Sequence, residues 1–314
     1  MAGSKRIEWI DLCKGLGIFL VVIGHTSIAQ ISQTLYDWIY SFHMPMFYML
    51  SGMVFNPAKY NSFRTYLQRR VKTLVIPFFI LNTILYLCVK WVDLPNIQPP
   101  MSELLTGVLA MYFIRVLFVS ELWYYGCCRF LKNAWLRIAV IVGLIIISHL
   151  FHFRIGWWSI LIPSMPLLFY ALGHLLKESL DNSKDRVADK FLVAICVGTL
   201  CVSLLAISYA HSFYTSILLA LVGSATLISL SIVLSKRCTA IVKDKIKFIG
   251  ENTLVIVAAH QIIYNSMKLI TGQWINNTML EGCVRMCLLW VVLILIIILF
   301  NRYFYWVLGK QKRS

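Results

Sequence analysis

Ionisable side chains interrupt the first apolar stretch of the chain, RIEWIDLCKGLGIFLVVIGH at residues 6–25. Among them are Asp11, Lys14 and His25. A charged group in or near the hydrocarbon of a membrane is costly, so such groups usually have a partner or a function there. Histidine is the natural general base for activating a hydroxyl group, because an imidazole titrates near neutral pH. These residue types point to acid–base chemistry at a membrane helix, with His25 as the base.

A helix over this stretch would align the three side chains. At about 100° per residue, the eleven steps from Lys14 to His25 return to within roughly 20° of one face, about 16 Å further along the axis. Asp11 lies about one turn before Lys14 on much the same stripe. We therefore expect Asp11, Lys14 and His25 to be catalytic residues, with Lys14 in a positioning role. The alternative is a histidine that simply ends a helix at the membrane interface.

The composition places the chain in a membrane. Of its 314 residues 60% are hydrophobic and only 13% are charged, and the apolar runs are long enough to span a bilayer. The net charge of +16 does not indicate a nucleic-acid partner, because the basic residues lie between the apolar runs and not in one solvated patch. The nine cysteines include no CxxC pair, so neither a disulfide framework nor a zinc site is expected.

The pattern of apolar runs predicts an all-α, polytopic integral membrane protein, with residues 1–314 as one domain. Most of the 29 lysines and arginines fall on one side of the membrane if both termini are cytoplasmic. The connections 177–190 and 236–248 are expected to be polar loops, and the first helix is expected to be retained rather than cleaved as a signal peptide. About ten transmembrane helices are predicted, at 7–29, 38–56, 72–92, 104–128, 135–150, 157–176, 190–210, 213–235, 249–268 and 282–306.

A dense basic cluster precedes the third predicted helix. It consists of Arg64, Arg69, Arg70 and Lys72. Arginine forks match phosphate oxygens, so the cluster could bind the phosphates of a nucleotide-like cofactor. The alternative is a topology signal that contacts anionic lipid headgroups.

Four further polar residues lie within predicted helices. His43 falls at about the depth of His25, so the two could line one cavity, although His43 could also simply be interfacial. Arg115 and Glu121 are about 240° apart around one helix, so each needs a partner elsewhere: either a structural ion pair or a path for the cofactor. We expect Arg115 to bind the cofactor, and His43, Glu121 and His260 to contact the substrate.

Several stretches together resemble the acyltransferase-3 family, particularly its short members related to fucose 4-O-acetylases and bacterial surface-polysaccharide O-acetyltransferases. The first two blocks are the specific ones, and the later ones follow in the family's order. The matching stretches are residues 6–25, HMPMFYMLSG at 43–52, RRVKTLVIP at 69–77, MYFIRVLF at 111–118, LLFYALGHLLK at 167–177 and IGENTLVIVAAH at 249–260.

The resemblance implies a ten-helix enzyme of the bacterial plasma membrane. Such an enzyme transfers an acyl group, usually acetyl, from cytoplasmic acetyl-CoA to a hydroxyl of a cell-surface or lipid-linked glycan on the far side, and no metal is expected. The family's signature of a basic residue, ten positions and a histidine falls on Lys14 and His25. Its arginine motif associated with acyl-CoA falls on Arg69 and Lys72, where lysine replaces the second arginine.

Three other functions remain open from the residues alone. A transporter or flippase for a lipid-linked sugar would also need buried charges, but it would not need acyl-CoA, and no internal repeat is evident. A non-catalytic partner in glycan assembly would leave His25 and Lys14 dispensable. A different membrane O-acyltransferase superfamily would use His260 as its catalytic histidine.

Overall fold

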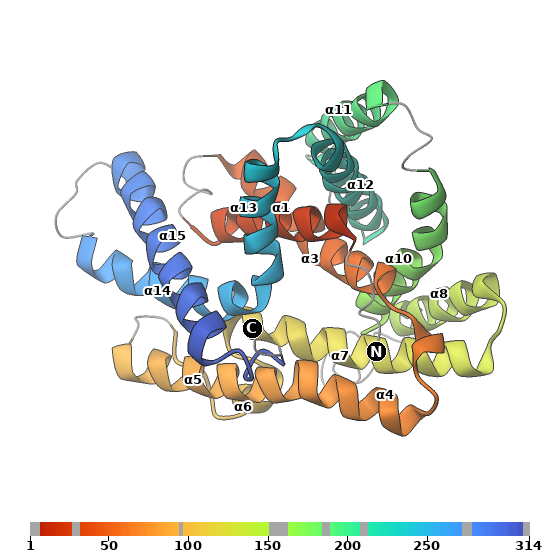
Figure 1. The fold of residues 1–314 in the computed structure, drawn as a ribbon, viewed down its shortest axis with the longest axis horizontal. Helices are drawn as coiled ribbons and strands as arrows, with labels where there is room; N and C mark the ends of the chain where they lie inside the picture. Colours follow the sequence, from red (N-terminus) through yellow and green to blue (C-terminus); the bar gives the residue numbers. More distant parts are fainter. Residues whose placement is uncertain are drawn as a thin grey trace. The chain divides into compact units, whose positions relative to one another are not determined.

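The computed structural model describes residues 7–26, 32–93, 97–150, 163–183, 189–207, 213–271 and 278–309 (Figure 1). Over these ranges the chain forms helices and no strand. It divides into two compact units. The first unit combines Met1–Leu50 with Lys177–Thr253, and the second combines Ser51–Leu176 with Leu254–Ser314.

The first unit is built around α1 (Glu8–Gly24). This helix packs against α12 (Phe213–Arg237) and α13 (Ala240–Glu251), and α11 (Asp189–Ala206) packs against α12. The unit also contains most of α3 (Gln33–Met53). Its core includes Leu12, Cys13, Ile18, Ile39, Phe42 and Met46.

Two glycines let α1 and α13 approach closely. A Cβ atom on Gly15 would collide with the backbone carbonyl of Ile246, and one on Gly250 would collide with that of Asp11. Only glycine fits such a backbone contact, which is also how helices in membranes commonly pack. The catalytic segment predicted from the sequence is thus held along its first half by α13.

The second unit contains a continuous helix of 30 residues, Phe63–Val92. It consists of α4 (Phe63–Arg70), a π-helical stretch (Val71–Val75) and α5 (Ile76–Val92). The antiparallel α7 (Tyr112–Phe130) runs beside it (Figure 1). The pairing is set by a stack of Tyr66 on Tyr125, with ring centroids 4.1 Å apart, and by an ion pair one turn further along.

The other elements of the second unit are short turns and apolar helices. They are η1 (Pro57–Lys59), α6 (Glu103–Thr106), η3 (Leu109–Met111), α8 (Ala134–Leu150), most of α10 (Ser164–Ser183), most of α14 (Thr253–Thr271) and α15 (Thr278–Tyr303).

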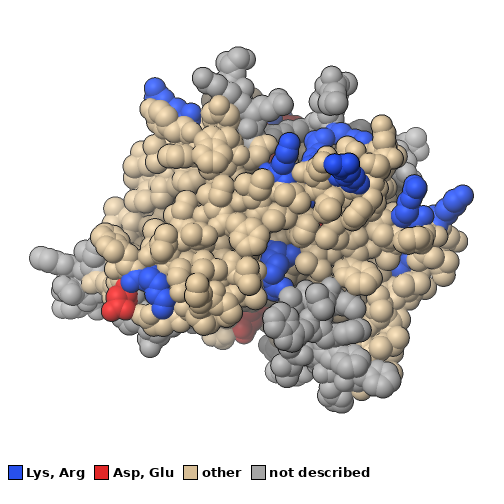
Figure 2. All heavy atoms as spheres, turned by 90° about the horizontal axis from the view of Figure 1, so that it is seen from below, with Lys and Arg blue, Asp and Glu red and all other residues tan. Residues whose placement is uncertain are grey.

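Three helices of the described chain are long and apolar enough to cross a membrane: Phe63–Val92, Thr215–Arg237 and Leu280–Tyr303. A fourth span arises if Ala240–Glu251 and Thr253–Leu269, bent by 76°, are taken together. The face in Figure 2 is mostly uncharged, with separate basic residues and few acidic ones. These findings agree with an all-helical membrane protein. Ten spans, cytoplasmic termini and a single domain over 1–314 stay predictions.

Two sequence-based predictions of local structure are wrong. The predicted loop 236–248 is largely helical, because its lysines lie on α13, which packs on α1. The predicted continuous helix 104–128 is broken after Thr106, where Gly107 has a φ of 106°. In addition, α10 continues to Ser183 through part of the predicted loop 177–190.

Parts of four predictions lie outside the described residues. They are the ends of the predicted helices 7–29 and 190–210, the start of the predicted helix 157–176 and the middle of the loop 177–190.

Candidate active site

His25 follows the last residue of α1. Its backbone N–H donates to the carbonyls of Val21, at 3.1 Å, and Val22, at 3.2 Å, so it extends the final turn of the helix. The side chain is half-buried. Its Nδ1 atom lies 2.9 Å from the hydroxyl of Tyr40 on α3, and the two rings meet edge to face. When Nδ1–H donates to this hydroxyl, Nε2 carries the lone pair that a general base needs.

Tyr40 also contacts the second predicted histidine. Its ring packs edge to face against His43, with centroids 5.0 Å apart, and stacks on Tyr36 at 4.2 Å. His43 is only 6% exposed, and its Nδ1–H donates to the carbonyl of Ile39 at 2.9 Å. The structure therefore brings His25 and His43 together through Tyr40, with His25 the more accessible of the two.

Asp11 and Lys14, which their spacing places on one stripe of the helix, form an ion pair. The Lys14 Nζ atom lies 3.7 Å from Oδ1 of Asp11, and Asp11 is buried. Near the start of the same helix, Glu8 lies 3.6 Å from Lys243 of α13. Lys14 and His25 are three helical turns apart, so they do not act on the same atom. Their shared helix fixes the distance between them.

The predicted basic cluster splits into two parts in the second unit. Arg64, Arg69 and Lys72 are exposed. Arg70 instead turns inward and forms an ion pair with Glu121 of α7, which is 3% exposed. Lys72 lies in the π-helical stretch, and such widened turns often occur at functional sites. Three of the four predicted cations are thus available to a phosphate-bearing ligand.

Glu121 and Arg115 do not pair with each other. The Glu121 carboxylate meets Arg70, while Nε of Arg115 donates to the carbonyl of Thr106 at 3.0 Å. His260, the third residue predicted to contact the substrate, is 1% exposed in α14. Its Nδ1–H donates to the carbonyl of Ile256 at 2.7 Å. Glu121 and His260 are thus both buried side chains that belong to the second unit.

Sequence reasoning missed Tyr40. A tyrosine in an apolar helix is usually interfacial, so its residue type alone gave no signal. Its position three residues before His43 was the available clue, because residues three apart share a helical face. The contact with His25 depends on how α1 and α3 pack, which the sequence does not display.

The family model of the acyltransferase domain, acyltransferase-3, matches residues 7–306, which is nearly the whole chain. Neither the curated proteins nor the solved structures contain a match. The match includes α1 with Lys14 and His25, together with both helices of the Arg70–Glu121 pair. The chain therefore belongs to the acyltransferase-3 family and is a membrane acyltransferase.

Proposed function

We propose that this protein transfers an acetyl or other small acyl group from cytoplasmic acetyl-CoA to a hydroxyl of a cell-surface or lipid-linked glycan, on the extracytoplasmic side of the bacterial cell membrane. The observation that carries the proposal is His25 itself. It lies half-buried at the end of α1, with Nδ1 2.9 Å from the Tyr40 hydroxyl, in a chain of the acyltransferase-3 family.

His25 would act through Nε2. This atom accepts the proton of the acceptor hydroxyl while the hydroxyl oxygen attacks the thioester carbonyl. The C–S bond then breaks, and CoA leaves as a thiolate that takes the proton from the imidazolium. In the covalent variant Nε2 attacks the thioester carbonyl first, and the C–S bond breaks with release of CoA as a thiolate. The acceptor hydroxyl then attacks the acyl-histidine and displaces the imidazole, and the hydroxyl proton goes to the thiolate. Both routes need the same ring orientation, which the contact with Tyr40 supports.

The acyl donor would be held by the exposed cations of the second unit. Arg64 and Arg69 lie on α4, and Lys72 lies in the π-helical stretch that follows. Arginine and lysine bind phosphate oxygens through charge-assisted hydrogen bonds, so these three side chains suit the phosphates of CoA. Arg70 would support them indirectly, because its ion pair with Glu121 ties α4 to α7.

The remaining predicted residues would have supporting roles. Asp11 and Lys14 would orient α1, and His43 would face the acceptor side of the site through Tyr40. The protein would work among membrane lipids with a glycan acceptor, and no nucleic-acid partner is proposed.

The test is acyl transfer by the purified protein in liposomes. Radiolabelled acetyl-CoA is supplied on one side only and an acceptor glycan on the other, and labelled glycan and free CoA are measured. Transfer is expected with wild type and is lost with His25→Ala. If acetyl-CoA neither raises the thermal unfolding temperature nor releases CoA, the proposal is overturned and a transport role becomes the better explanation.

A further inference from the structure

The segment after α5 folds back along that helix. Asn82, fully buried in the middle of α5, donates through Nδ2 to the carbonyls of Glu103, at 2.9 Å, and Leu104, at 3.0 Å. Its Oδ1 accepts the N–H of Val108 at 2.8 Å. Asn82 lies ten residues before Val92, which is about 15 Å along the helix. The returning segment, residues 97–111, therefore runs back along α5 from the C-terminal end of that helix to about its middle.

The returning segment has an unusual backbone conformation. Leu109 has a φ of 50° and Gly107 one of 106°. A positive φ is rare for leucine, and such strained residues persist only where the surroundings hold them, often at ligand sites. Here Gln261 of α14 holds the turn, because its Oε1 accepts the N–H of Ala110 at 3.0 Å. The strain is thus maintained from two sides, by Asn82 and by Gln261.

A pocket of about 600 Å³, lined by polar and apolar groups alike and called the polar pocket below, lies against this segment. Its polar lining consists of Gln98, Glu103, Thr106, Tyr112 and Arg115. Amide, carboxylate and hydroxyl groups are the partners that sugar hydroxyls require, and the exposed ring of Tyr112 offers a flat apolar face. The volume lies within the range of small-ligand sites. The pocket thus has the size and chemistry for a sugar unit.

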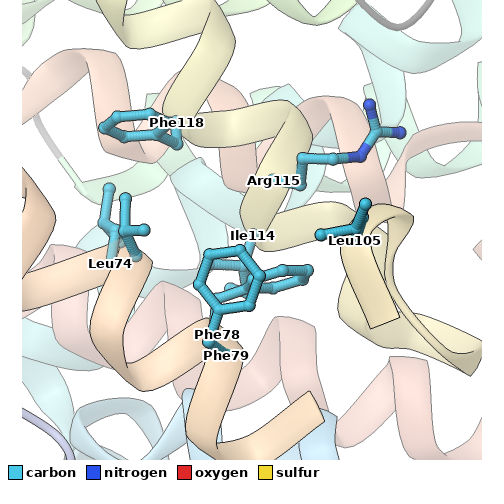
Figure 3. Close-up of a pocket in the computed structure, with 8 residues that line it drawn as sticks. Leu74, Phe78, Phe79, Leu105, Ile114, Arg115 and Phe118 are labelled. Atoms are coloured by element: carbon cyan, nitrogen blue, oxygen red, sulfur yellow. The ribbon is translucent and has the colours of Figure 1, made fainter. Parts of the chain in front are cut away.

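A second pocket, of about 180 Å³, lies between α5 and α7 and is apolar. Its walls include Leu74, Phe78, Phe79 and Phe118 (Figure 3). Arg115 lines both pockets. In Figure 3 its stem borders the apolar pocket, and its guanidinium points away from the phenylalanines. A cationic group therefore stands where the apolar and the polar pocket meet.

We propose that these two pockets bind a phosphate-linked glycolipid, with its chain in the apolar pocket, its phosphate at Arg115 and its sugar in the polar pocket. The inference rests on the proposed function and names the acceptor as lipid-linked. The charge pattern of the sequence predicts that α5 ends on the extracytoplasmic side, where such an acceptor would be modified.

The arrangement favours this ligand over a bulk phospholipid. The apolar pocket, at about 180 Å³, has room for part of one chain, whereas a phospholipid carries two, and the polar pocket, at about 600 Å³, is far larger than a phosphate requires. It also favours the acceptor over the donor, because neither pocket is lined by Arg64, Arg69 or Lys72.

The test measures binding to the purified full-length protein in detergent, without acyl donor. The probes are farnesyl phosphate linked to glucose, farnesyl phosphate, farnesyl glucoside and glucose 1-phosphate. Wild type should bind the complete probe at least tenfold more tightly than any partial one. Arg115→Gln should weaken both farnesyl phosphates about tenfold and change the glucoside less than twofold. Arg129→Gln, exposed at the other end of α7, is the matched control and should change nothing.

Two more variants make the test specific. Glu103→Ala should weaken the two farnesyl probes that carry glucose and leave farnesyl phosphate unchanged, since only the backbone of Glu103 meets Asn82. If Arg115→Gln does not fold, Phe79→Trp replaces it and should weaken only probes with a chain. The proposal is overturned if the Arg115 and Phe79 variants bind every probe as tightly as wild type does. It is also overturned if phosphatidylglycerol competes as strongly as the complete probe does. The binding assay contains no acyl donor, so failure here is distinct from failure of acyl transfer.

Discussion

The hydroxyl of Tyr40 and Nδ1 of His25 lie 2.9 Å apart, which connects α3 to the end of α1. The helices are close at this point because Gly24 has no side chain: a Cβ atom there would lie 3.1 Å from the Tyr40 ring. The hydrogen bond fixes the orientation of the imidazole, and in the tautomer with Nδ1–H it leaves the Nε2 lone pair for the proposed base. Tyr40 is therefore a positioning residue for the proposed base.

Removal of the Tyr40 hydroxyl should slow catalysis without weakening donor binding. In Tyr40→Phe, kcat should fall about fivefold to tenfold, since a lost hydrogen bond costs about 1 kcal/mol. The KM for acetyl-CoA should stay within twofold. The control is Tyr36→Phe, which loses a hydroxyl from the neighbouring stacked ring. An equal loss of kcat in both variants, or none in Tyr40→Phe, would contradict the positioning role.

The Arg70–Glu121 pair should be structural. Arg70→Met leaves the buried Glu121 carboxylate without its partner, which should destabilise the protein by about 3–5 kcal/mol. The double variant Arg70→Met/Glu121→Leu should recover most of this loss, because it removes both charges. Thermal unfolding in detergent measures each effect. If the double variant is as unstable as the single one, the ion pair is not the cause.

The exposed cations should act on the donor and not on stability. Arg69→Gln and Lys72→Gln should each raise the KM for acetyl-CoA about tenfold, because each removes a charge-assisted hydrogen bond to phosphate. The unfolding temperature should not change. Lys59→Gln, which alters an exposed lysine just before α4, should leave KM unchanged. A similar KM for all three variants and wild type would exclude this surface as the donor site.

The close contact of α1 with α13 should tolerate no side chain. Gly15→Ala should destabilise the protein by about 1–3 kcal/mol, because the new methyl group meets the carbonyl of Ile246. Gly198→Ala on α11 is the matched control, since no atom of the described chain lies within 4 Å of a Cβ there. It should be neutral or slightly stabilising, as alanine favours helix. Equal unfolding temperatures for the two variants would contradict the close helix contact.

Helical spacing in the sequence predicted neighbours within one helix better than contacts between helices. The pair of Asp11 with Lys14 follows from helical spacing within one helix, which needs no knowledge of other elements. The inward turn of Arg70 does not, because a cluster of basic residues in the sequence carries no sign of the buried Glu121 on another helix. Tyr40 was missed for the same reason.

The prediction of the helices had the same limit: it used the composition of each segment and not the contacts between segments. The composition of a long apolar run, such as that of α12 or α15, is enough to predict a helix. By contrast, α13 was predicted as a loop because its lysines dominate its composition, while its packing depends on Gly15 and Gly250. The break before α7 depends on the side chain of Asn82, a long-range contact that no local pattern displays.

The most direct test of the account compares alkali-labile acetyl esters on surface glycans from cells that carry the intact protein, a deletion, or His25→Ala at a matched membrane level. The account predicts that the deletion and His25→Ala lose the same ester. If His25→Ala keeps the ester that the deletion loses, His25 is not the catalytic base. If even the deletion changes no acyl group, acyl transfer to a surface glycan is not the function of this protein.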